Sequence, residues 1–127
     1  MQMILSIAAG GALGAVTRHM VNKASFAWFG PGFPWGTLAV NVVGSFLMGV
    51  FIGWMAREGT VSQELRAFLT VGFLGALTTF SSFSLDAVTL FERGATLQAA
   101  AYVAANVILA LGALVLGLAI MRMGASA

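Results

Sequence analysis

The chain has few charged side chains and no cysteine. Only 8% of its 127 residues are Asp, Glu, Lys or Arg, and 60% are hydrophobic. A typical soluble domain carries about 25% charged residues, so this chain could not cover a water-exposed surface. The composition therefore predicts an integral membrane protein. The absence of cysteine excludes disulfides and thiolate metal sites, and it leaves the redox compartment open.

Groups for acid–base chemistry are also scarce. The chain has one histidine, His19, and four acidic residues, and none of them forms a His–carboxylate cluster, a carboxylate pair or a metal-binding spacing. We expect no enzymatic activity and interpret His19 as a residue at the membrane interface. A net charge of +2 is too small for a nucleic-acid-binding surface.

Four apolar runs are long enough to cross a bilayer, which takes about 20 helical residues. They cover about residues 3–20, 36–56, 65–91 and 96–121. No run alternates like a barrel strand, so the expected class is an all-α protein with four transmembrane helices in one domain, 1–127. Both prolines fall in a loop expected over 22–35, and Ser62 is placed to cap the third helix.

The third run contains a stretch that suits a continuous helix poorly. Residues 72–84 read GFLGALTTFSSFS. Glycine lowers helix propensity, and Ser and Thr offer the backbone competing hydrogen bonds. Irregular backbone inside a bilayer is tolerated only where it faces protein or a water-filled path. We therefore expect the third helix to break in mid-membrane around 75–79, where freed carbonyls could hold a cation.

Neutral hydrogen-bonding side chains recur inside the expected spans. Such groups can hold neighbouring helices together, or they can replace part of the hydration shell of an anion. Phe80 and Phe83 could present their positive ring edges to the same anion, or they could be ordinary core residues. The residues alone leave both interpretations open. The neutral groups are Asn41, Thr78, Thr79, Ser81, Ser82, Ser84, Tyr102 and Asn106. Asp86 is the one acidic residue inside an expected span.

The basic residues give no preferred orientation. Four spans would place Arg57, Arg66 and Arg122 on one side of the membrane and Arg18, Lys23 and Arg93 on the other. A balance of three against three cancels the bias that normally orients a membrane protein. Together with the small size of the subunit, it suggests an antiparallel homodimer with a self-complementary interface.

At this point the sequence resembles a known family. The stretch over 72–84, with GAVTR at 14–18 and GTLAVNVVG at 36–44, closely matches the signature of the Fluc family of microbial fluoride channels. The resemblance covers essentially the whole chain. It implies a fluoride-selective channel in the inner (plasma) membrane that exports fluoride passively from the cytoplasm. It also implies a dual-topology, antiparallel homodimer with two pores.

The resemblance also implies roles for individual residues. Phe80 and Phe83 would line the pore, Arg18 would stand near the aqueous vestibule, and backbone carbonyls of Gly75 and Thr78 from both subunits would hold a central structural sodium ion. Ser82 replaces a threonine common in the family, and Ala110 lies where some members have a hydroxyl. The remaining residues of the implied fluoride path are Asn41, Thr79, Ser81, Ser82, Tyr102 and Asn106.

Two other functions are compatible with a four-helix membrane protein of this size. A small dual-topology multidrug or cation transporter needs an ionisable carboxylate in its first span, and residues 4–17 contain none. A structural or assembly subunit would carry out no transport. Fluoride efflux that needs no proton gradient would separate the channel from the transporter, and absence of flux in purified vesicles would indicate the assembly subunit.

Overall fold

The computed structural model describes residues 1–126, with side chains described through 124, and all regular structure in this range is helical. Helix α1 spans Gln2–Phe29, α2 spans Trp35–Glu58 and α6 spans Thr96–Ser126. Between α2 and α6 runs a segmented rod, which we call the third rod. It consists of α3 (Gln63–Ala67), the π-helix η1 (Phe68–Leu74), α4 (Gly75–Leu77) and α5 (Phe80–Glu92).

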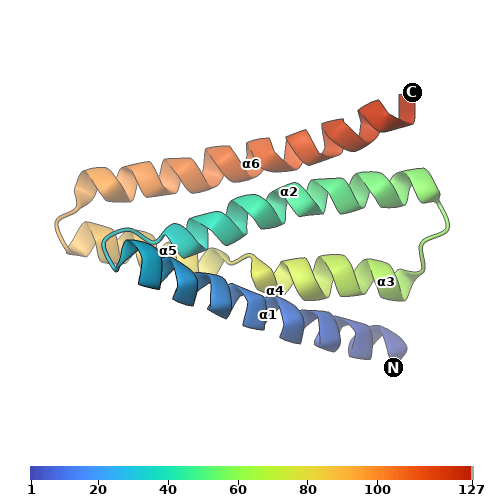
Figure 1. The fold of residues 1–127 in the computed structure, drawn as a ribbon, viewed down its shortest axis with the longest axis horizontal. Helices are drawn as coiled ribbons and strands as arrows, with labels where there is room; N and C mark the ends of the chain where they lie inside the picture. Colours follow the sequence, from blue (N-terminus) through green and yellow to red (C-terminus); the bar gives the residue numbers. More distant parts are fainter. Residues whose placement is uncertain (127) are drawn as a thin grey trace.

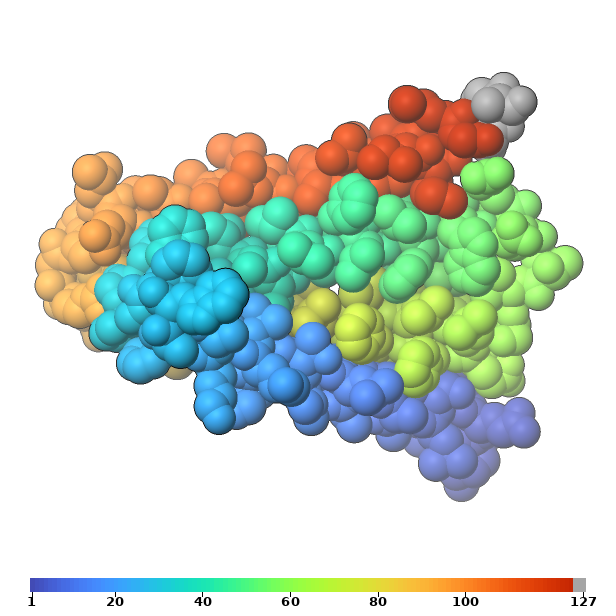
Figure 2. All heavy atoms as spheres, in the orientation of Figure 1, coloured from blue at the N-terminus to red at the C-terminus, as the bar shows by residue number. Residues whose placement is uncertain are grey.

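The prediction of four spans is confirmed by length and composition. Four helical segments are long and apolar enough to cross a membrane: Gln2–Phe29, Trp35–Glu58, Gln63–Glu92 and Thr96–Gly124. Figures 1 and 2 show α1 and α6 at opposite edges, with α2 and the third rod between them. Both termini lie at one end with the α2–α3 connection, and the α1–α2 loop and the α5–α6 turn lie at the other (Figure 1).

The first loop is shorter than the expected 22–35. Helix α1 continues to Phe29, and the connecting segment is 30–34. The reason is local, since no helix breaker occurs until Gly30, which has φ of +75°, and Pro31. Arg18 and His19 therefore lie within a helix rather than at its end, and His19 is exposed there. Downstream, Ser62 caps α3 as expected, because its Oγ accepts the N–H of Leu65 at 3.1 Å.

Glycines allow close contact at two helix interfaces. A Cβ at Gly14 of α1 would overlap the carbonyl oxygen of Phe73 in the third rod, and one at Gly10 would overlap that of Phe68. In the same way, Gly49 of α2 lies against the backbone of Leu114 in α6. Small residues let membrane helices approach backbone to backbone, so these glycines permit the close packing at both interfaces.

Candidate functional site

The third rod is interrupted at two consecutive threonines. Helix α4 ends at Leu77, Thr78 and Thr79 are extended with ψ of 156° and 126°, and α5 begins at Phe80. The Thr79 Oγ1 atom caps α5 by accepting the N–H of Ser82 at 3.1 Å. Extended backbone at an N-cap is the usual geometry for a threonine in that position. The interruption expected over 75–79 is therefore present, and its extended part is confined to Thr78 and Thr79.

Asn41 of α2 binds both backbone groups of Thr79. Its Oδ1 accepts the Thr79 N–H at 2.8 Å, and its Nδ2 donates to the Thr79 carbonyl at 3.1 Å. The same Nδ2 donates to Asn106 Oδ1 of α6 at 2.9 Å, and Asn106 in turn donates to the Tyr102 carbonyl at 3.0 Å. Since an amide nitrogen carries two hydrogens, both donors of Asn41 are used within the subunit.

Arg18 of α1 spans the interruption from the other side. Its Nε donates to the Ala76 carbonyl of α4 at 3.0 Å, and its Nη1 donates to Ser82 Oγ of α5 at 3.2 Å. In a continuous helix the Ala76 carbonyl would accept the N–H of Phe80. The half-buried guanidinium therefore satisfies a carbonyl of the interruption and ties the two helical halves together.

An uncharged groove of about 300 Å³ opens beside the interruption. It brings together six of the residues expected to hold an ion: Asn41, Thr78, Thr79, Phe80, Phe83 and Asn106. The other lining residues are Ser45, Val107, Ala110 and Leu111, and none of the ten carries a charge. Sequence reasoning did not select Ser45, although it stands one helical turn after Asn41 and therefore on the same face of α2.

Aromatic rings line one side of this groove and continue behind it. The Phe80 and Phe83 ring centroids are 5.4 Å apart at 61°, so the edge of one ring meets the face of the other. Phe83 is 9% exposed and Phe80 is 78% exposed, so Phe80 projects from the single subunit. Tyr102 is fully buried behind Phe83, with ring centroids 5.5 Å apart.

Three residues of the expected fluoride path do not line the groove: Ser81, Ser82 and Tyr102. Ser81 is exposed, with its Oγ 3.4 Å from Thr79 Oγ1, while Ser82 is engaged by Arg18. Tyr102 directs its hydroxyl away from the groove and donates to Asp86 Oδ2 at 2.9 Å. The expected set is thus divided between the groove, the face toward α1 and the region around Asp86.

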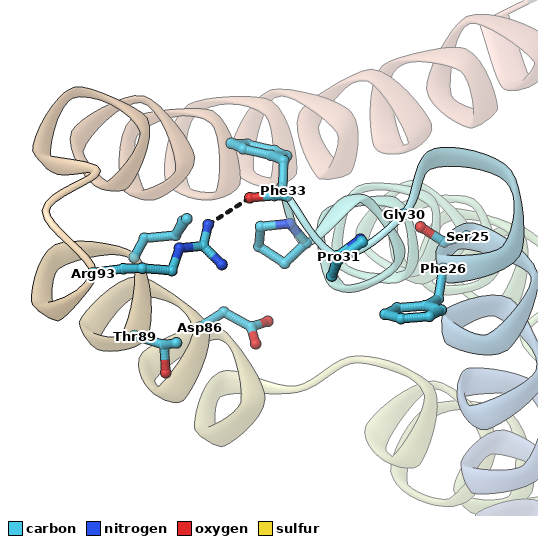
Figure 3. A pocket seen from close by; sticks show the side chains of 11 residues that line it. Ser25, Phe26, Gly30, Pro31, Phe33, Asp86, Thr89 and Arg93 are labelled. Carbon is cyan, nitrogen blue, oxygen red and sulfur yellow. Dashed lines mark hydrogen bonds between the residues drawn. The ribbon is translucent and has the colours of Figure 1, made fainter.

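Asp86 lies at a second cavity, of about 210 Å³, between the α1–α2 loop and α5. Figure 3 shows its carboxylate and the Arg93 guanidinium directed into this cavity. Arg93 Nη2 donates to the Gly32 carbonyl at 2.7 Å and so holds the loop against the end of α5. Phe33 of the same loop packs edge-on against Tyr102, with centroids 5.4 Å apart at 88°. The loop therefore covers the Tyr102 end of the subunit.

The carbonyls of Gly75 and Thr78 lack the donors that they would have in a continuous helix. In a continuous helix they would accept the N–H groups of Thr79 and Ser82. Those donors are bonded to Asn41 Oδ1 and Thr79 Oγ1 instead. Carbonyl oxygens released from helical bonds in this way are suitable ligands for a hard cation. Within the described residues, no group of three or more His, Cys, Asp or Glu side chains is placed to hold a metal ion.

The fold and the groove define the class of protein. The subunit has four long apolar helices, and an uncharged groove opens between α2, α6 and the interruption of the third rod. Large apolar side chains such as Leu97 and Trp28 are more than 80% exposed on the outside. Such a surface suits lipid and not water. The chain is a multi-pass protein of the plasma membrane.

Comparison with known proteins gives the family. A family model described as "CrcB-like protein, Camphor Resistance (CrcB)" matches residues 5–118, and the chain belongs to this family. A protein of Rhodospirillum centenum is 55% identical over 96% of this chain and 97% of its own length. Relatives from Rhizobium etli (53% identical; 91% and 93%) and Sphingopyxis alaskensis (51%; 96% and 97%) are equally well covered. All three are named fluoride-specific ion channel FluC, which confirms the resemblance seen in the sequence.

Proposed function

We propose that this chain is a fluoride-selective ion channel that lets fluoride leave the cytoplasm passively. The observation that carries the proposal is the uncharged groove beside the interruption of the third rod, lined by Asn106, Thr79 and the two phenylalanines. Hydroxyl and amide donors can replace part of the hydration shell of fluoride, and ring edges carry partial positive charge. No cation in the groove would trap the ion. The names of the relatives support the same ion.

We also propose that the channel works as an antiparallel homodimer with two pores. Phe80 is 78% exposed in the single subunit, so a second copy is needed to complete the wall around it. The charge distribution adds modest support. Arg18 lies beside the interruption of the third rod and not at an end of the helices, so Arg57, Arg66 and Arg122 lie toward one end and Lys23 and Arg93 toward the other. A difference of one basic residue orients a protein weakly.

The central sodium ion belongs to this proposal as well. The carbonyls of Gly75 and Thr78, with their counterparts in the partner, would supply its oxygen ligands, and the ion would hold the two interrupted helices together in mid-membrane. The support is the diversion of the Thr79 and Ser82 donors to other acceptors. The ion would act as a structural element and would not move with each fluoride ion.

The transporter alternative lacks its chemical requirement. A proton-coupled multidrug transporter needs an ionisable carboxylate in its first span, and α1 (Gln2–Phe29) contains neither Asp nor Glu. Asp86 of α5 is instead hydrogen-bonded to Tyr102. An assembly subunit without transport remains the third possibility, and it predicts no flux from vesicles that contain this protein alone.

The proposal is tested by ion efflux from proteoliposomes that contain only the purified protein. Fluoride efflux should greatly exceed chloride efflux and should need no proton gradient. Phe80→Ile and Phe83→Ile should each reduce fluoride flux, because the ring edges are lost while the groove remains apolar.

A matched control is Phe26→Ile, since Phe26 is exposed on α1 and does not line the groove. If Phe80→Ile and Phe83→Ile both conduct like the parent, the pore assignment is wrong. If the parent releases chloride as fast as fluoride, the proposal of fluoride selectivity fails.

A further inference from the structure

Helices α2 and α6 run side by side in the same direction (Figure 1), so residues that face each other do so in constant register. Asn41 and Asn106 form one such pair, with a hydrogen bond of 2.9 Å. Eight residues further along each helix, Gly49 lies against the Leu114 backbone. Ser45 and Ala110 occupy the turn between these two pairs, and both line the uncharged groove.

Ser45 is the polar lining residue whose hydroxyl has no partner in the described part of the chain. The other four, Asn41, Thr78, Thr79 and Asn106, are all engaged in hydrogen bonds. Serine and threonine hydroxyls in helices commonly donate to the carbonyl four residues earlier, as Thr17 and Thr70 do in this chain. The Ser45 hydroxyl makes no such bond.

The residue opposite offers the hydroxyl no partner. At the first pair of the register, the Asn41 amide donates to the Asn106 amide oxygen. At the second pair, the methyl group of Ala110 offers no hydrogen-bonding atom. An unsatisfied hydroxyl at membrane depth carries a free-energy cost unless it meets a ligand or water. The position of Ser45 in the groove, one turn from Asn41, provides access to such a ligand.

We propose that Ser45 donates a hydrogen bond to the permeating anion and is a selectivity-determining residue of the pore. This inference rests on the proposed fluoride channel. Fluoride is small and holds its hydration shell tightly, so one additional neutral donor lowers its dehydration cost more than that of chloride. The structure assigns this donor to α2, because α6 carries only Ala110 at the same level.

The test uses four variants in proteoliposomes and planar bilayers: Ser45→Ala, Ser45→Thr, Ala110→Ser and the double variant Ser45→Ala/Ala110→Ser. A hydrogen bond to a charged group is worth enough that Ser45→Ala should lower fluoride flux about tenfold. It should also shift the reversal potential measured between fluoride and chloride solutions. Ser45→Thr keeps the hydroxyl and should behave like the parent. The double variant moves the hydroxyl across the groove and should restore most of the flux.

The reversal potential does not depend on the number of active channels, so a folding defect alone would leave it unchanged. Ser6→Ala is the control, because Ser6 is a half-buried serine of α1 outside the groove. Parent-like flux and reversal potential in Ser45→Ala would overturn the inference while leaving the fluoride channel intact. A parent without fluoride flux would overturn both. If Ser45→Ala does not fold, Ser45→Cys decides, since a thiol has similar size but is a weak donor.

Discussion

At the scale of single residues, Asn41 lines the groove and also binds the backbone at the interruption of the third rod. Both of its amide hydrogens and its oxygen are bonded within the subunit, to Thr79 and Asn106. Its side-chain amide accepts from the Thr79 N–H and donates to the Thr79 carbonyl, as the backbone of a neighbouring β-strand would. Its main effect in the subunit is therefore to stabilise extended backbone that has no helical partners of its own.

Replacement of Asn41 by alanine should destabilise the protein and lower fluoride flux together. The change leaves the Thr79 N–H and carbonyl without partners, and each unsatisfied buried group costs about 1–3 kcal/mol. The unfolding temperature in detergent should fall, and efflux from vesicles should fall with it. Gln98→Ala removes an exposed amide of α6 and should change neither quantity. A parent-like unfolding temperature for Asn41→Ala would contradict the structural role.

Arg18 should not be replaceable by lysine. Two of its nitrogens reach two acceptors, Ala76 carbonyl and Ser82 Oγ, on opposite sides of the interruption. A lysine has a single ammonium group and lacks the planar fork that fits both. Arg18→Lys should therefore lose most of the fluoride flux even though the charge is kept. Lys23→Gln, an exposed change on the same helix, should retain it. Full activity of Arg18→Lys would show that only the charge matters.

At the scale of helices, the contact between α1 and the third rod depends on glycine. A Cβ at Gly14 would overlap the Phe73 carbonyl, whereas the nearest atom to a Cβ at the neighbouring Gly11 is 4.0 Å away. Gly14→Ala should therefore cost about 1–3 kcal/mol in stability, as other overpacking changes do, and Gly11→Ala should cost little. Thermal unfolding in detergent, followed by size-exclusion chromatography, measures both. Equal stability of the two variants would contradict the packing described.

At the scale of the whole molecule, orientation in the membrane can be tested directly because the chain has no cysteine of its own. Thr60 is exposed in the α2–α3 connection, and Thr96 is exposed at the opposite end. For a dual-topology dimer, a membrane-impermeant maleimide should label about half of Thr60→Cys and half of Thr96→Cys in intact spheroplasts. Permeabilisation should expose the remainder. Complete labelling of one variant and none of the other would show a single orientation.

Composition and local patterns are enough to define the class of the molecule and most of its helices. Scarce charge and four long apolar runs leave an all-helical membrane protein as the expected solution, because backbone groups in lipid must be satisfied internally. Gly59, Gly94 and the Ser62 cap mark helix ends through local backbone chemistry, so they could be located in advance. The two adjacent threonines likewise indicated where the third helix is interrupted.

The partners of the buried polar groups, in contrast, depend on long-range contacts. Arg18 is 58 residues from Ala76, and Asn41 is 65 residues from Asn106, so no local pattern predicts that these pairs satisfy each other. The π-helix over Phe68–Leu74 packs against α1, and no local sequence pattern predicted it. The unpaired hydroxyl of Ser45 depends on the register of α2 against α6. Local chemistry determines where a helix stops, but long-range contacts determine which donors remain available for an ion.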